Sequence, residues 1–214
     1  MPDSQLSTPE PISEPENAVV TTRKRPKPGE RRVQILQALA TMLEQPGADR
    51  ITTAALAARL EVSEAALYRH FASKAQMFEG LIEFIEQSVF TLINQIVGRE
   101  ETGSAQAAKV IAMLLQFAEK NPGMTRVMVG DALVFENDRL QQRMNQFFDK
   151  IEATLKQSLR GGVEVEASAT PSADAQIKAS MLTSFVVGRL QRFARSGFRR
   201  MPSEHLEASL AQML

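Results

Sequence analysis

The stretch from Ile51 to Phe71 constrains the fold of this chain more than any other. It reads ITTAALAARLEVSEAALYRHF, in which two short helical patterns meet across a turn of roughly three or four residues. Thr52 or Thr53 can cap the first helix, and Ser63, which Glu64 follows at once, can cap the second. The stretch therefore predicts a helix-turn-helix, a motif that places its second helix in the major groove of DNA.

The two sides of this helix pair differ in chemistry. Leu67 and Phe71 are four residues apart and share a face, and the side chains that should point inward are Leu56, Leu60, Val62, Leu67 and Phe71. The outer face would carry hydroxyls, one cation and small methyl groups, from Ser63, Ala65, Ala66, Tyr68, Arg69 and His70. Such a face fits a major groove about 12 Å wide, where alanine methyls can meet thymine methyls and Arg69 and Tyr68 can make polar contacts.

Three further residues are expected to hold the DNA backbone. Thr52, Thr53 and Lys74 lie at predicted helix N-termini, where backbone N–H groups and the helix dipole favour a phosphate. A packing corner of a helical bundle is the alternative for the motif as a whole. For His70, orientation of a phosphate contact and an ordinary surface histidine both stay open.

The N-terminal region changes sign of charge along its length. Residues 1–22 contain four acids and no basic residue, whereas 23–32 contain six basic residues against Glu30 alone. Six of the ten prolines fall within the first 28 residues, so we predict a disordered, proline-rich arm over 1–28 with a basic end. The basic part, Arg23 to Arg32, would follow the minor groove or remain a solvated tail.

The remainder of the chain shows helical spacing of apolar residues and no sustained strand pattern, so the predicted class is all-α. We predict a DNA-binding domain over 29–75 and a helical domain for dimerisation and partner binding over 76–214. A first helix from Glu30 should end at Pro46-Gly47. The later helices are expected at about 74–97, 105–120, 124–136, 138–160, 174–198 and 203–213, with a break at Gly98 to Gly103 and a flexible loop at Gly161 to Ser172.

Composition excludes several classes of function. The chain has no cysteine and two histidines, so neither a thiol nucleophile nor a metal cluster is expected. No paired carboxylates or phosphate-binding glycine loop occurs at workable spacing, which argues against an enzyme and against a bound cofactor. No apolar stretch has the length of a membrane span and no signal peptide is evident, so we expect a cytoplasmic protein.

The run Leu67-Tyr68-Arg69-His70-Phe71-Ala72-Ser73-Lys74 resembles the end of the recognition helix and the start of the fourth helix in the TetR family. Residues 50–71, 77–88, 119–148 and 151–160 resemble, more narrowly, the nucleoid occlusion factors of that family. The resemblance implies a nucleoid-associated homodimer that binds palindromic chromosomal DNA. It also implies that the DNA-bound dimer engages the C-terminal tail of the division protein FtsZ and blocks ring assembly over the nucleoid.

The resemblance further implies a site for the FtsZ tail between helices 74–97 and 105–120. The expected residues are Phe84, Met113, Gln116, Lys120 and Asn121. Phe84 and Asn121 match the family, and Lys120 keeps its positive charge. Leu92 stands where an arginine is expected, Gln116 where a glycine is expected, and Glu61 where the turn usually carries a glycine with positive φ. Burial of Phe84 in the core is the alternative to exposure.

The helix 174–198 is the candidate for the dimer contact, together with helix 138–160. Its expected contact residues are Ile177, Met181, Phe185, Gly188 and Phe193, with the small Ser184 nearby. Packing within one chain is the alternative. A ligand-released transcriptional repressor is the alternative function, and it would need a pocket of several hundred Å³ in the bundle; no small-molecule ligand is favoured.

Overall fold

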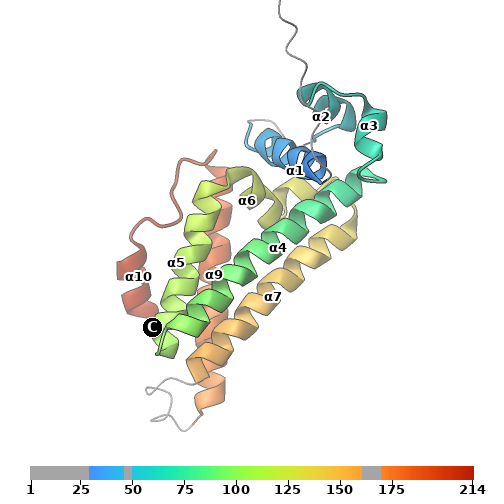
Figure 1. The fold of residues 1–214 in the computed structure, drawn as a ribbon. Helices are drawn as coiled ribbons and strands as arrows, with labels where there is room; N and C mark the ends of the chain where they lie inside the picture. Colours follow the sequence, from blue (N-terminus) through green and yellow to red (C-terminus); the bar gives the residue numbers. More distant parts are fainter. Residues whose placement is uncertain (1–28, 46–49, 161–169) are drawn as a thin grey trace, which may run out of the picture.

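The computed structural model describes residues 29–45, 50–160 and 170–214, and within these ranges every regular element is a helix. Three short helices stand at one end of the molecule (Figure 1). They are α1 (Glu30–Leu43), α2 (Thr53–Arg59) and α3 (Glu64–Tyr68). Together they form the helix-turn-helix end that the sequence predicts.

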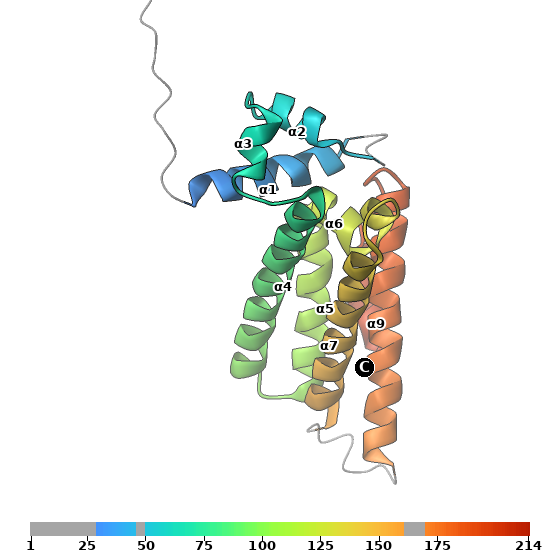
Figure 2. The ribbon, with the colours of Figure 1, turned by 90° about the vertical axis from the view of Figure 1, so that its right-hand side faces the viewer.

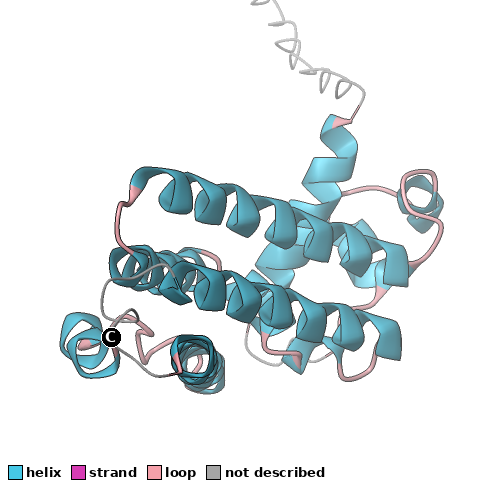
Figure 3. Ribbon diagram, turned by 90° about the horizontal axis from the view of Figure 1, so that it is seen from below, coloured by secondary structure: helices cyan, strands magenta, loops and turns pink. Residues whose placement is uncertain are grey.

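The other helices build an elongated bundle beneath them. They are α4 (Lys74–Arg99), α5 (Gly103–Lys120), α6 (Pro122–Met128), the 3-10 helix η1 (Asp131–Leu133), α7 (Asp138–Arg160), α9 (Pro171–Arg195) and α10 (Leu206–Met213). The four long helices α4, α5, α7 and α9 run alongside one another (Figure 2). α7 packs against α9, and α5 contacts α4, α7 and α9 (Figure 3 shows the bundle from below). None of the helices in the described ranges is both long and apolar enough to cross a membrane.

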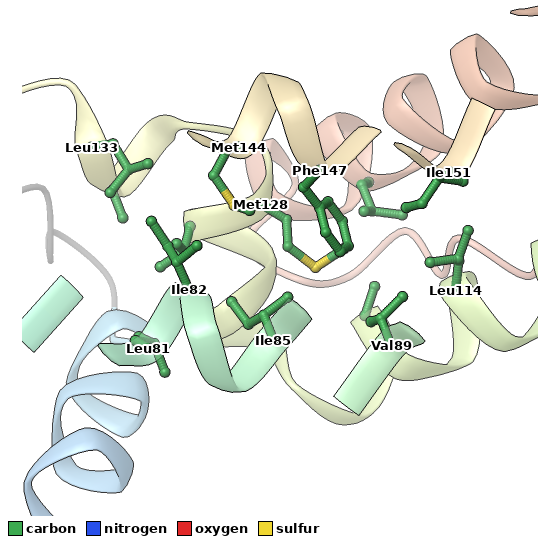
Figure 4. Close-up of a cluster of buried hydrophobic side chains, with 14 of the residues drawn as sticks. Leu81, Ile82, Ile85, Val89, Leu114, Met128, Leu133, Met144, Phe147 and Ile151 are labelled. Carbon is green, nitrogen blue, oxygen red and sulfur yellow. The ribbon is translucent and has the colours of Figure 1, made fainter. Parts of the chain in front are cut away.

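The core of the bundle is filled by branched aliphatic and aromatic side chains. Phe147 of α7 is fully buried among Ile85, Val89 and Leu114 (Figure 4), and its ring meets Phe90 edge-to-face with the ring centres 5.7 Å apart. On α5 the buried residues are Ala107, Val110, Ile111, Leu114, Leu115 and Ala118. The helix is not enclosed on every side, since Gln116 and Lys120 on one flank are exposed.

Two glycines fix close approaches that the sequence alone does not reveal. A Cβ on Gly123 would lie 1.9 Å from the backbone oxygen of Ala40, so only glycine lets α6 pack against α1. A Cβ on Gly103 would lie 2.1 Å from the backbone oxygen of Ser158, so α5 begins directly against α7. The first of these contacts seats the helix-turn-helix end on the bundle.

Several predicted helix ends are wrong. α4 continues through Gly98 to Arg99, and α5 begins at Gly103 behind the cap Thr102, so Gly98 does not break a helix. The single helix expected at 124–136 is instead α6 and η1, separated by Gly130 at φ +85°. α9 ends at Arg195, followed by positive φ at Gly197 and Phe198.

The predicted N-terminal arm requires one correction. Arg31 and Arg32 belong to helix α1, because α1 begins at Glu30. They are therefore fixed on the helix-turn-helix end and cannot be part of an extended arm. The rest of the arm, the expected stop at Pro46-Gly47 and most of the loop expected at Gly161 to Ser172 lie outside the described residues.

Candidate nucleic-acid interface

The two helices of the motif are capped by side chains from their own sequence. The hydroxyl oxygen of Thr52 accepts a hydrogen bond from the backbone N–H of Ala55 at 3.1 Å, so Thr52 rather than Thr53 is the cap of α2. The hydroxyl oxygen of Ser63 accepts from the N–H of Ala66 at 3.3 Å. α3 ends at Tyr68, earlier than the predicted Phe71.

The turn between the helices closes with Glu61 in the left-handed conformation, at φ +53°. The N–H of Val62 donates to the backbone oxygen of Ala57 at 3.0 Å, and the N–H of Glu61 donates to that of Ala58 at 3.1 Å. These two bonds define a Schellman motif, in which the left-handed position is normally glycine. Glu61 therefore occupies the position with positive φ at which the sequence analysis expected a glycine.

The predicted inner and outer faces of the motif are confirmed. Leu56, Leu67 and Phe71 are buried, and Leu60 and Val62 are half-buried against the core. The outer side is open to solvent: Ser63, Ala65, Tyr68, Arg69 and His70 are exposed, as is Thr52, while Ala66 and Thr53 are half-buried. Tyr68 as a whole residue is 45% exposed. A short helix with small side chains at its start and a cation at its end therefore faces solvent.

A polar chain crosses this outer face and includes a residue that sequence reasoning missed. The Thr53 hydroxyl donates to a carboxylate oxygen of Glu64 at 2.5 Å, and the Tyr68 hydroxyl donates to Thr53 at 3.5 Å. Glu64 thus lies beside the residues expected to contact DNA. The sequence showed only that Glu64 lies in the first turn of the helix, and not that it contacts Thr53.

Arg32, which the sequence analysis placed in the basic part of the N-terminal arm, instead packs against the helix-turn-helix. Its Nη1 donates to the backbone oxygen of His70 at 2.9 Å, and its guanidinium carbon lies 4.0 Å from the centre of the Phe71 ring. α1 therefore holds the turn that follows α3.

Lys74 lies where the sequence placed it, at the first position of α4 behind the cap Ser73. Its ammonium group, however, forms an ion pair with Glu136, and the two side chains are 26% and 10% exposed. The ammonium group that was expected to contact a phosphate is therefore bound to a carboxylate from the segment between η1 and α7.

The residues expected to bind a protein partner lie on α4, on α5 and at the C-terminal end of α5. Phe84 is 46% exposed, so it does not belong to the core. Five residues along a helix correspond to a rotation of about 140°, so Phe84 points away from the α7 side, where Glu79 pairs with Arg139. Phe84 therefore lies on a solvent-exposed face of α4.

On α5, the flank that faces α4 is marked by two contacts. Lys109 pairs with Glu100 at 2.5 Å, and the Gln106 side chain donates to the backbone oxygen of Glu100 at 2.9 Å. Met113, Gln116 and Lys120 continue this flank at helical spacing, with Met113 half-buried and the other two exposed. Asn121 is half-buried at the end of α5, where its amide donates to the backbone oxygen of Phe117 at 2.7 Å.

The expected dimer residues divide between surface and core. Ile177 and Met181 are 57% and 52% exposed, and Ser184 is exposed beside them. Phe185 is half-buried under the guanidinium of Arg189, and a Cβ added at Gly188 would meet nothing within 4 Å. Phe193 was predicted wrongly: it is 1% exposed and packs edge-to-face on Phe198.

Comparison with known proteins decides the family. Residues 35–81 match the family described as "Bacterial regulatory proteins, tetR family", and residues 103–214 match the SlmA-like "Tetracyclin repressor-like, C-terminal domain". The nucleoid occlusion factor SlmA of Idiomarina loihiensis is 51% identical over 178 residues, which are 83% of this chain and 90% of that protein. SlmA of Vibrio cholerae is 52% identical over 178 residues, with the same two shares. The chain belongs to the SlmA family of nucleoid occlusion factors.

Solved structures agree with the fold of this SlmA-family chain. The FadR regulator of Bacillus subtilis, crystallised with stearoyl-CoA, superposes with a TM-score of 0.68 over 85% of this chain and 96% of its own, at 14% identity. The regulator PfmR of Thermus thermophilus superposes with a TM-score of 0.67 over 86% of this chain and 95% of its own, at 18% identity. Together with the family matches, they confirm the predicted all-helical TetR-like fold, and the chain is a DNA-binding protein.

The bundle of this SlmA-family chain forms crevices at its surface. One of about 530 Å³ lies at the ends of α4, α5 and α7 that are remote from the helix-turn-helix, and its lining includes Asn94, Gln106 and Gln157. It is polar and open to solvent, unlike the enclosed, mostly apolar pockets that hold small ligands.

Proposed function

We propose that this chain is a nucleoid occlusion factor, which binds palindromic chromosomal sites as a homodimer and inhibits cell division while bound. The observation that carries the proposal is the identity of about one half with proteins named SlmA, over more than four fifths of the chain. That similarity extends through the C-terminal helices, where the family match covers residues 103–214. The function needs no catalysis, in keeping with a family described as bacterial regulatory proteins.

The outer face of α3 is the proposed reader of DNA sequence. Ser63, Ala65 and Ala66 leave room for α3 to enter the major groove, while Tyr68 and Arg69 supply polar contacts to bases. Thr52, Thr53 and His70 lie at the borders of this face, where contacts to the sugar-phosphate backbone fix register and not sequence. Their exposure, with Thr53 half-buried, supports these roles.

The seam of α4 and α5 is the proposed site for the FtsZ tail. Phe84 offers an exposed aromatic ring, Met113 an apolar edge and Lys120 a cation, and an extended peptide with a carboxylate end would use all three. Gln116 would contribute a polar side chain to the same seam. The amide of Asn121 is bound to Phe117, so its role would be to hold the end of α5.

The exposed apolar residues of α9 support a homodimer, which would place the protein on the nucleoid at paired half-sites. Ile177 and Met181 lie on α9, which packs against α7, so the two helices of each protomer would form a four-helix contact. Two recognition helices related by a two-fold axis should lie about 34 Å apart on DNA. A ligand-released repressor is less well supported, because the crevice described above is polar and open, and a second one of about 480 Å³ beside Phe90, although more apolar, is more open still.

Binding of a synthetic FtsZ C-terminal tail peptide tests the proposal directly. We expect the wild-type protein to bind the peptide, and more tightly when a palindromic duplex is present. Phe84→Ala should weaken peptide binding and leave DNA binding unchanged. Met201→Ala is the matched control, since Met201 is 54% exposed and lies between α9 and α10. An absence of peptide binding both with and without DNA would refute the proposed division inhibitor.

A further inference from the structure

The ion pair between Lys74 and Glu136 occupies the junction between the DNA-binding helices and the bundle. Lys74 opens α4 immediately after the recognition helix, and Glu136 precedes α7. The two residues are 62 positions apart in the sequence. Lys74 also lies over the ring of Phe78, 5.7 Å from its centre, so its side chain is directed along the protein surface.

Glu136 is held in place by its neighbours. Its backbone N–H donates to the oxygen of Leu133 at 3.0 Å, and Leu133 is buried. On the other side, Asn137 accepts a hydrogen bond from the N–H of Arg139 with its side-chain oxygen at 3.1 Å and so begins α7. The backbone at Glu136 is therefore fixed, and its carboxylate could follow the Lys74 ammonium group only as far as its own side chain reaches. A mostly buried carboxylate without its partner is strongly unfavourable, so the pair should persist on DNA.

Two further ion pairs join α4 to α7, on a different flank of α4 from Lys74. Glu79 pairs with Arg139, and Glu86 pairs with Arg143 at 2.6 Å. α4 carries the helix-turn-helix, whereas α7 belongs to the proposed dimer contact. These two pairs fix α4 against α7, and the Lys74–Glu136 pair fixes the N-terminal end of α4, which follows the recognition helix, against the segment before α7.

We infer that Lys74 is a positioning residue for DNA recognition, which sets the tilt of the DNA-binding helices through Glu136, and that it is not a phosphate ligand. The inference rests on the proposed binding of palindromic DNA by a dimer. In a dimer, a change in the tilt of α4 in each protomer changes the separation of two recognition helices. That separation must match one turn of DNA.

The test measures binding of full-length protein to a palindromic duplex that the wild-type protein selects from a random pool. Glu136→Gln removes the carboxylate and leaves Lys74 available for phosphate. If Lys74 is a positioning residue, this change weakens binding by about tenfold, the loss that one poorly fitted base contact causes. If Lys74 is a phosphate ligand held back by Glu136, the same change tightens binding. An unchanged or tighter affinity overturns the inference.

Two further measurements distinguish the positioning role from other roles of Lys74. They are the salt dependence of DNA affinity and the DNA affinity of a double variant in which the charges of Lys74 and Glu136 are exchanged. Lys74→Gln should lower affinity without changing the slope of log affinity against log salt, whereas loss of one phosphate contact from each protomer would reduce that slope by about 1.8. The exchanged double variant Lys74→Glu with Glu136→Lys should recover binding. Failure of the exchanged variant to bind while it remains folded overturns the inference.

The matched control is Glu100→Gln, which removes the carboxylate from the Lys109 ion pair at the opposite end of α4. It should leave DNA affinity and the salt slope unchanged. Circular dichroism checks that each variant is folded, and if Glu136→Gln unfolds, the exchanged variant decides the outcome. If the wild-type protein binds no palindromic duplex, the proposed function itself fails. If the wild-type protein binds but the variants do not behave as expected, only the positioning role of Lys74 fails.

Discussion

The guanidinium of Arg32 in α1 lies 4.0 Å from the centre of the Phe71 ring, at the end of the helix-turn-helix. Phe71 is buried between this cation and Gly80 of α4, where an added Cβ would lie 3.1 Å from the ring. One aromatic residue thus joins the first helix of the DNA-binding end to the long helix of the bundle. The recognition helix is held from beneath by this contact.

Arg32→Lys tests the planar contact, because lysine keeps the charge and loses the flat guanidinium that stacks on the ring. We expect the free energy of unfolding to fall by about 1 kcal/mol, since cation–π contacts at exposed sites are worth roughly 0.5–1 kcal/mol and a hydrogen bond is also perturbed. Denaturant titration measures this change. Arg31→Lys is the control, and an equal loss in both variants would contradict a specific role for Arg32.

Glu61→Gly should stabilise the protein. The left-handed conformation at Glu61, φ +53°, costs a residue with a Cβ about 1 kcal/mol, and glycine relieves that cost. The control is Ala58→Gly, at an exposed position of α2. This change should lower the free energy of unfolding by about 1 kcal/mol, because glycine is unfavourable inside a helix. If both glycines lower the thermal midpoint equally, the turn carries no strain.

Glu86→Gln tests the ion pair that joins α4 to α7. The hydrogen bond from Arg143 to Glu86 raises the pKa of the guanidinium, which remains protonated in any case. Because the folded-state pKa of Arg143 is raised, its contribution is complete below the unfolded value and is lost only at strongly alkaline pH. We expect a loss of about 1–3 kcal/mol on substitution, equal at about pH 7 and about pH 9.

The control for that substitution is Glu83→Gln, since Glu83 is exposed on the same helix. Urea denaturation at both pH values gives the comparison. A loss from Glu86→Gln no larger than that from Glu83→Gln would show that the pair contributes nothing to stability. A loss that shrinks between the two pH values would contradict a guanidinium of Arg143 that stays protonated throughout this range.

Ile177→Glu and Met181→Glu should each separate the proposed dimer into monomers. Each substitution puts a charge into a surface that a dimer would bury, and DNA affinity should fall because the two half-sites are then bound independently. Sedimentation velocity measures the oligomeric state of each variant. Met201→Glu is the control, because Met201 is another exposed methionine. If the variants remain dimeric, the dimer contact does not include Ile177 and Met181 and must lie elsewhere on the protein.

Local chemistry made most of the fold predictable from the sequence. The caps Thr52, Ser63 and Ser73 mark helix starts because their side chains bond to backbone N–H groups three residues ahead. The inner face of the helix-turn-helix follows from the same local spacing of apolar residues. Domain boundaries and site residues remain predictions.

What the sequence did not predict depends on contacts between distant parts of the chain. The break at Gly130 faces Gln141, and the partner of Lys74 lies 62 residues away, so neither could be found from local patterns. Phe193 was placed on the dimer surface because α9 has apolar residues on two faces. Helical spacing alone does not tell which face meets the core and which meets a partner.

Mapping of bound sites across the chromosome tests the central claim most directly. Wild-type protein crosslinked in growing cells should occupy many dispersed palindromes, and the Arg69→Ala variant should lose them. Occupancy confined to one or two promoters would contradict nucleoid occlusion and would identify a conventional repressor.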